Sequence, residues 1–113
     1  PTLPGTLAAP VDHWPVAEGT IDGIFGLLAI HELRSHIDRV KWFCEARRVI
    51  TPDGRVILIE HVRDAANFVV FGPGFLHFHS VETWTRSWQN AGFKLAETFR
   101  ISPWLRVFIL IAS

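Results

Sequence analysis

The 113-residue sequence has one cysteine and no excess of charge of either sign. A single cysteine, Cys44, excludes an intramolecular disulfide and a zinc site built from cysteines, and its place inside a helical pattern predicts a small buried apolar residue. The 11 Lys and Arg balance the 11 Asp and Glu. This balance gives no electrostatic reason to expect binding to nucleic acid or to an acidic membrane surface.

Long apolar runs are missing as well. No run reaches the roughly 18 residues that a membrane helix needs. Residues 1–10 have no basic segment followed by an apolar core, so we expect no signal peptide and a soluble, cytoplasmic protein. The same ten residues hold three prolines and a glycine, which predicts an irregular arm ahead of a single domain at residues 11–113.

What the sequence does have is the composition of a folded domain. Hydrophobic residues make up 49% of the chain and charged residues 19%, and a chain of this length can bury one real core. Nine Phe and five Trp, against no Tyr, are a heavy aromatic load. Most of these rings are expected in the core, although some could line a pocket or an interface.

The apolar pattern predicts the order strand, helix, strand, helix, strand, strand. We expect the strands at residues 21–28, 55–61, 94–101 and 105–112, and the helices at residues 36–50 and 81–91. In the first strand, Gly23 and Gly26 suggest close approach by another backbone or a ligand. The last two strands are joined so closely that an antiparallel hairpin is favoured, because a parallel return needs about a dozen residues. A mixed α/β sheet follows.

Residues 48–61 are the centre of this pattern. They predict the end of a helix, a tight turn at residues 51–54, and then a strand. The run at residues 56–59 is apolar without alternation, as in a strand covered on both faces. Glu60 and His61 follow at the carboxyl end of this strand, which is where open α/β sheets bind their ligands. These two side chains could contact a substrate or simply solvate the strand end.

The helix at residues 36–50 carries one broad apolar face. Its members are Ile37, Val40, Phe43, Cys44, Ala46 and Ile50. Arg47 falls inside this face, so we expect its stem to lie on the sheet and its charge to point outward.

Several short motifs occur in a recognisable order. They are Asp12, Trp14 and Pro15 ahead of the first strand, Ile21 and Asp22 at its start, Glu45 and Arg48 at the helix end, the turn Pro52-Asp53-Gly54, and Ala91-Gly92-Phe93 before the hairpin. Together these motifs resemble the C-terminal half of class I S-adenosylmethionine-dependent methyltransferases of the small-molecule type. The resemblance covers about residues 11–112.

This resemblance implies a truncated Rossmann-like methyltransferase sheet. The family's strand order is 3-2-1-4-5-7-6, and this chain has counterparts of strands 4-5-7-6, with two helices and a C-terminal antiparallel hairpin. The glycine-rich loop and the acidic residue that hold the cofactor's methionine end and ribose have no counterpart. The strand at residues 21–28 would be an open edge, which we expect a second copy of the chain, the arm at residues 1–20 or a complementing N-terminal half to cover.

The resemblance also implies S-adenosylmethionine as the cofactor. Asp12 would accept a hydrogen bond from the adenine amino group, and Trp14 would stack beside the adenine. Leu27, Leu28 and Ala29 would lie along the cofactor at the strand end. Each position has a structural alternative: the aspartate as a turn or cap residue, the tryptophan packed under a loop, and the three strand residues in the core.

His31 is the candidate catalytic residue. At the carboxyl edge of the sheet, a neutral imidazole could act as a general base on a substrate hydroxyl. The alternative is a loop histidine that bonds a backbone carbonyl. His31 and His36 do not form a zinc-protease motif, because the second histidine stands at i+5 rather than i+4.

The segment at residues 62–79 predicts an apolar lid over the substrate. The candidate substrate-binding residues are Phe71, Phe75, His77 and His79 in this segment, together with Glu60 and His61. The alternative is a loop whose aromatic rings fill the core or a dimer interface. His77 and His79 could form half of a metal site, but the spacing identifies no third ligand, and we expect no metal.

We therefore expect an S-adenosylmethionine-dependent methyltransferase-like protein that acts on a small apolar molecule. Since half of the cofactor site is missing, activity is expected only when a missing half or a partner chain complements this one. That chain, or a second copy, would join through the strand at residues 21–28; no nucleic acid or membrane is expected. The alternative is a non-catalytic dimeric module for small-molecule binding or assembly, and a third possibility is a fragment of a longer methyltransferase.

Overall fold

A computed structural model describes residues 9–27, 33, 35–61, 69, 72 and 79–113 of the chain. Its elements follow the predicted order. They are β1 (Ile21–Leu27), α1 (His36–Val49), β2 (Ile50–Glu60), α3 (Val81–Asn90), β3 (Phe93–Arg100) and β4 (Arg106–Ala112). Most of the predicted arm, residues 1–8, lies outside the described residues, so the arm stays a prediction.

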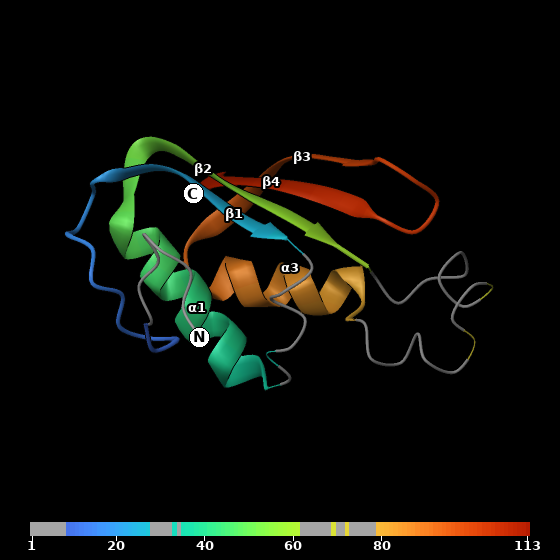
Figure 1. Cartoon of the computed structure of the whole chain (residues 1–113), viewed down its shortest axis with the longest axis horizontal. Helices are drawn as coiled ribbons and strands as arrows, with labels where there is room; N and C mark the ends of the chain where they lie inside the picture. Colours follow the sequence, from blue (N-terminus) through green and yellow to red (C-terminus); the bar gives the residue numbers. More distant parts are fainter. Residues whose placement is uncertain (1–8, 28–32, 34, 62–68, 70–71, 73–78) are drawn as a thin grey trace, which may run out of the picture.

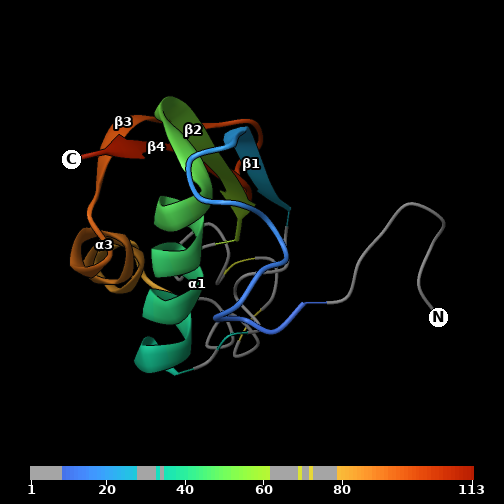
Figure 2. The same ribbon diagram turned by 90° about the vertical axis from the view of Figure 1, so that its left-hand side faces the viewer.

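The four strands form one mixed sheet in the order β1-β2-β4-β3. β1 is parallel to β2, and β4 is antiparallel to both β2 and β3. This arrangement confirms the predicted sheet with its C-terminal hairpin. Both helices lie on the same side of the sheet (Figures 1 and 2). Among the described residues, no helix is long and apolar enough to cross a membrane.

Each helix begins at a serine. The Ser35 hydroxyl accepts a hydrogen bond from the backbone N–H of Asp38 at 3.0 Å, and the Ser80 hydroxyl accepts one from the N–H of Thr83 at 3.2 Å. These bonds satisfy N–H groups that the first turn of a helix leaves without a partner. At the other end of α3, Gly92 has a φ of +91°, a conformation that glycine adopts without strain.

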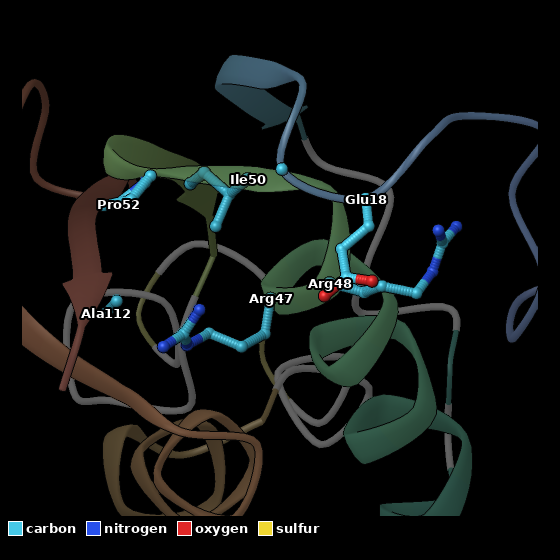
Figure 3. Close-up of a pocket in the computed structure, with 7 residues that line it drawn as sticks. Glu18, Arg47, Arg48, Ile50, Pro52 and Ala112 are labelled. Carbon is cyan, nitrogen blue, oxygen red and sulfur yellow. The ribbon is translucent and has the colours of Figure 1, made fainter.

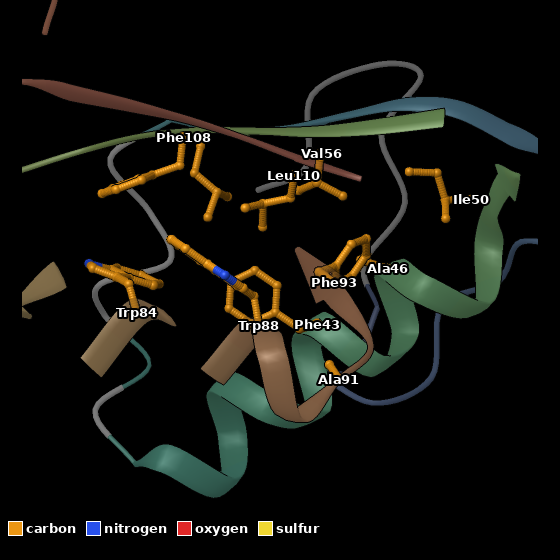
Figure 4. Packing of buried hydrophobic residues seen from close by; sticks show 11 residues of the cluster. Phe43, Ala46, Ile50, Val56, Trp84, Trp88, Ala91, Phe93, Phe108 and Leu110 are labelled. Carbon is orange, nitrogen blue, oxygen red and sulfur yellow. The ribbon is translucent and has the colours of Figure 1, made fainter. Parts of the chain in front are cut away.

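Aromatic rings fill the space between the helices and the sheet (Figure 4). Phe43 of α1 is fully buried, and its ring lies edge-on to those of Trp84, Trp88 and Phe93, with centroids 6.3 to 6.5 Å apart. Side chains of β2 and β4 close the core from above; these are Val56, Leu58, Phe108 and Leu110. Since rings of this size bury much apolar area, this cluster dominates the core.

The opposite side of the sheet is apolar too, and we call it the outer face. Its side chains alternate with those of the core along each strand. Phe25 and Leu27 on β1 are 66% and 60% exposed. Their register partners on β2 are half-buried isoleucines. The outer face comprises Phe25, Leu27, Ile57, Ile59, Val107, Ile109 and Ile111, of which Val107 is buried.

The prediction of a separate tight turn at residues 51–54, ahead of the strand, is wrong. β2 already begins at Ile50, and its pairing with β1 passes from Ile21↔Ile50 to Gly23↔Arg55. Residues 51–54 therefore form a bulge inside the strand. Pro52 has no backbone N–H and cannot donate a hydrogen bond to a neighbouring strand. Proline is therefore tolerated in a strand at a bulge.

The predicted inner face of α1 is only partly right. Phe43 and Ala46 are buried as expected, but Ile37 is 66% exposed and Cys44 is exposed. Arg39 and Glu45 are buried instead, at 4% and 7% exposure. Both carry polar partners inside the fold, which apolar periodicity does not anticipate.

Residues 9–20 do not cover the edge of β1. The N–H groups of Gly19 and Thr20 donate instead to the carbonyl oxygens of Arg48 and Val49, at 2.9 and 2.8 Å. The approach to β1 is thus tied to the end of α1. The sequence predicted that the arm, a second copy of the chain or an N-terminal half would cover the edge of β1. The described part of the arm does not cover it.

Gly54 should tolerate no side chain. A Cβ atom there would overlap Cγ1 of Ile50 and lie 3.1 Å from the carbonyl oxygen of Asp22. Overpacking of this kind costs about 1–3 kcal/mol, so Gly54→Ala should lower the free energy of unfolding by that amount. Urea unfolding followed by tryptophan fluorescence would measure it.

Gly23→Ala is the matched control. A Cβ at this exposed strand position would meet only Cε2 of Phe25, at 3.7 Å, and neither glycine has a positive φ. This variant should change the free energy of unfolding by no more than about 0.5 kcal/mol. Equal destabilisation by the two substitutions would contradict the close approach at Gly54.

Candidate functional site

The carboxyl ends of β1 and β2 lie at the same edge of the sheet. The two strands are parallel, and Leu27 near the end of β1 pairs with Ile59 of β2. Leu27 is 60% exposed, so its side chain is available to a ligand or partner rather than buried in the core. Six predicted site residues lie outside the described part of the chain and stay predictions; they are Leu28, Ala29, His31, Phe71, Phe75 and His77.

Trp14 is held against α1. Its backbone N–H donates to Oε2 of Glu45, and its carbonyl oxygen accepts from Nη2 of Arg48 at 3.1 Å. The indole packs on the core and lies edge-on to Trp42, with centroids 5.4 Å apart. These contacts fix the segment that precedes β1, and they favour the packing role of the indole over stacking on adenine.

Asp12 stands two residues before this fixed point, in an exposed turn. Its side chain is open to solvent at this position. The carboxylate can therefore accept a hydrogen bond from a ligand amino group. The predicted role of Asp12 at the adenine stays a prediction that this geometry permits.

Glu45 and Arg48 hold that segment in place. The Arg48 guanidinium donates through both Nε and Nη2 to the Glu45 carboxylate, the second bond being 2.9 Å long. This hydrogen bond, followed by the Trp14 N–H and the positive charge of Arg48, lowers the pKa of Glu45 to about 2 although burial opposes the shift. The same bond raises the pKa of Arg48. The pair stays ionised at any physiological pH.

The three remaining predicted substrate residues differ in their surroundings. Glu60 is fully buried on the core side of β2, opposite Arg106 in the register. His61 has Nδ1 2.9 Å from the carbonyl oxygen of Trp104, so Nδ1 carries the proton and donates it. His79 is 5% exposed, edge-on to Trp84, with Nε2 3.4 Å from Nη1 of Arg39. Contact of these residues with a substrate stays a prediction.

A cavity of about 310 Å³ lies at the opposite end of the sheet (Figure 3). Its lining residues are Glu18, Gly19, Arg47, Arg48, Ile50, Pro52 and Ala112. These residues precede β1, open β2 and end β4, so the cavity is remote from the carboxyl edge. Arg47 and Arg48 leave the helix end in opposite directions, and Arg47 reaches along the cavity beside Gly92.

A second cavity, of about 210 Å³, lies between the two helices. It is lined by His36 and Arg39 of α1 and by Thr83 and Arg86 of α3. Within the described part of the chain, no group of three His, Cys, Asp or Glu side chains could hold a metal ion.

The Glu45–Arg48 pair was visible in the sequence only as part of a family motif. Its i,i+3 spacing on a helix is a general signal for an ion pair, but spacing alone does not reveal that the carboxylate also accepts the N–H of Trp14. Arg39 gave no sequence signal at all, because its partner Ser87 is 48 residues away.

Replacing Glu45 should test this clamp. Glu45→Gln removes the charge that the guanidinium and the Trp14 N–H bind, and should lower the free energy of unfolding by about 1–2 kcal/mol at pH 7. Because folding lowers the pKa of Glu45 from 4.5 to about 2, the stabilisation is complete above pH 4.5. The difference between wild type and variant should therefore shrink as the pH falls from 4.5 towards 2.

Glu97→Gln on the exposed strand β3 is the control for this comparison. It removes the same charge at a position without such a pair, and should leave the free energy of unfolding within about 0.5 kcal/mol of wild type. A Glu45→Gln effect that stays constant between pH 7 and pH 3 would contradict the assigned ion pair.

Comparison with known proteins gives matches in structure only. No model of a known protein family matches the chain, and no curated protein does. A SAM dependent methyltransferase from Aquifex aeolicus is similar in structure, with a TM-score of 0.78 and 19% identity over 95% of this chain and 54% of that one.

Two further matches also combine a similar structure with low sequence identity. The Mitomycin 7-O-methyltransferase MmcR has a TM-score of 0.77 at 14% identity, over 95% of this chain and 33% of that one. A chain of the complex between the Haloferax volcanii Trm112 methyltransferase activator and the putative methyltransferase has a TM-score of 0.74 at 13% identity, over 94% of this chain and 60% of that one.

The chain thus spans about half the length of the first structures that it matches. Identities below 20% establish a common fold and leave the activity open. The protein has a partial fold of the S-adenosylmethionine-dependent methyltransferase type.

Proposed function

We propose that this chain is the C-terminal part of a methyltransferase-like protein that transfers a methyl group from S-adenosylmethionine to a small apolar molecule. The observation that carries the proposal is the fold, which covers nearly all of this chain and about half of the chains it matches. The low identities leave the substrate to experiment.

The cofactor would supply an electrophilic methyl group on a sulfonium sulfur. The chain's own part would be to place the adenine end through Asp12 and to shape one wall of the site with Leu27. His31, if it lies near the acceptor, would take its proton. Catalysis of this kind depends mainly on holding the reactants in line. We assign the contacts to the methionine and ribose to a second half.

The complementing half is expected on β1 and the outer face. Phe25 and Leu27 are the most exposed apolar side chains of the sheet, and among the described residues β1 pairs with β2 alone. Parallel sheets are normally covered on both faces. We therefore assign this surface to the N-terminal half of a methyltransferase-like sheet, whether it comes from the same polypeptide or from a partner chain.

Cofactor titration tests the proposal. Isothermal titration of this chain alone with S-adenosylmethionine or S-adenosylhomocysteine should show no saturable binding, because we assign the methionine and ribose contacts to the complementing half. An N-terminally extended chain, or this chain mixed with its separate N-terminal half, should bind. Saturable binding by this chain alone would contradict the need for a complement.

A pair of aspartate variants then tests the assigned contact in the complemented protein. Asp12→Asn should weaken cofactor binding about tenfold, since it removes a charged acceptor. Asp53→Asn makes the same change at an exposed position in the β2 bulge and should leave binding unchanged. Equal affinities for the two variants would remove Asp12 from the site.

Without its complement, the chain should self-associate through β1. Light scattering over a concentration series should show growing mass for the wild type, because an open apolar strand edge recruits further strands. Phe25→Lys should shift this association to higher concentration, whereas Ile37→Lys should not, although Phe25 and Ile37 are both 66% exposed.

Two outcomes of that series would contradict the assignment. A wild-type monomer at every concentration would show that β1 needs no cover. A stable dimer that persists when the N-terminal half is added would favour the alternative, a dimeric module for small-molecule binding or assembly.

A further inference from the structure

The cavity between α1 and α3 has a lining that differs from every part of the proposed methyl-transfer site. Its four lining residues come in two pairs, His36 and Arg39 on one helix and Thr83 and Arg86 on the other. Each pair is spaced i,i+3, so one turn of each helix faces the cavity. Among the described residues that line it are two arginines, a histidine and a hydroxyl, and no carboxylate.

Arg39 is held rigidly at this position. The side chain is 4% exposed, Nε donates to the hydroxyl of Ser87 at 3.1 Å, and Nη1 donates to the carbonyl oxygen of Leu33 at 3.0 Å. Ser87 in turn donates to the carbonyl oxygen of Thr83, one turn earlier on α3. A guanidinium fixed in this way loses little side-chain freedom when a ligand binds.

Arg86 gives the second positive charge at the mouth of the cavity. Its side chain is exposed to solvent. Glu82 stands one turn earlier at i−4, where it can compete for the same guanidinium. His36 lies across the cavity with Nε2 3.0 Å from Nδ2 of Asn90.

The first turn of each helix contributes a residue to the lining. His36 is the first residue of α1, and Thr83 lies in the first turn of α3. The charge of the site therefore comes from its side chains, because His36 also contacts Asn90, the last residue of α3.

We propose that this cavity binds a phosphate group, either free or carried by a small molecule. Guanidinium groups recognise phosphate oxygens through paired N–H donors, which Arg86 can supply from the surface, while Arg39 adds a fixed positive charge beside them. A cavity of about 210 Å³ is large enough for a phosphate group with a few waters, each of which takes about 30 Å³. The site is independent of the proposed cofactor contacts, since it shares no residue with them.

Inorganic phosphate is the probe for a direct test on the whole chain. Titration at constant ionic strength, with chloride as the balancing anion, should show saturable binding by isothermal titration or by amide shifts in NMR spectra. Arg86→Gln should weaken it about tenfold, since one charged donor is lost. Arg86 is exposed, so this substitution should leave the fold intact, which Arg39 would not guarantee.

Two further variants make the test specific. Arg55→Gln removes the same charge from an exposed position of β2 and should leave the phosphate affinity unchanged. Glu82→Gln removes the competing carboxylate and should tighten binding. The proposal is overturned if the wild type shows no saturable phosphate binding, or if Arg86→Gln and Arg55→Gln weaken it equally. Either result would leave the methyltransferase proposal untouched, because the cofactor titration uses other residues.

Discussion

The packing of aromatic rings around Phe43 is the interaction on which the rest of the structure depends. This ring, fully buried, is edge-on to three others that come from α3 and β3. The cluster draws both helices to one side of the sheet (Figure 4). Since α1 and α3 both lie on that side, neither helix covers Phe25 and Leu27 of the outer face, which stay 66% and 60% exposed. The half-covered sheet is thus a direct result of where the large rings lie.

Element order could be read from the sequence because apolar periodicity and serine caps are local signals. The hairpin followed in the same way from its short connection. The bulge at residues 51–54 could not, since its proline and glycine have the chemistry of a turn, and only pairing with β1 places them inside a strand. The inner face of α1 also differed, because Arg39 and Glu45 are buried through partners that lie far away in sequence.

The candidate site was predictable only where a family motif marked it. Asp12 and Trp14 were found by resemblance, and the structure explains how their segment is held, through Glu45 and Arg48. The cavity between the helices has no comparable motif, since its lining comes from two separate helical turns. Residues that meet only in the folded chain carry no sequence signal that periodicity can detect.

Arg39 has a mechanical consequence for the edge where ligands are expected. Its guanidinium joins Leu33, which follows β1, to Ser87 of α3, and lies beside His79, which precedes that helix. One side chain thus sets the spacing between the two connections that flank the carboxyl edge. A substitution of Arg39 would therefore remove the bonds to Leu33 and to Ser87 at once, one next to each of the connections at this edge.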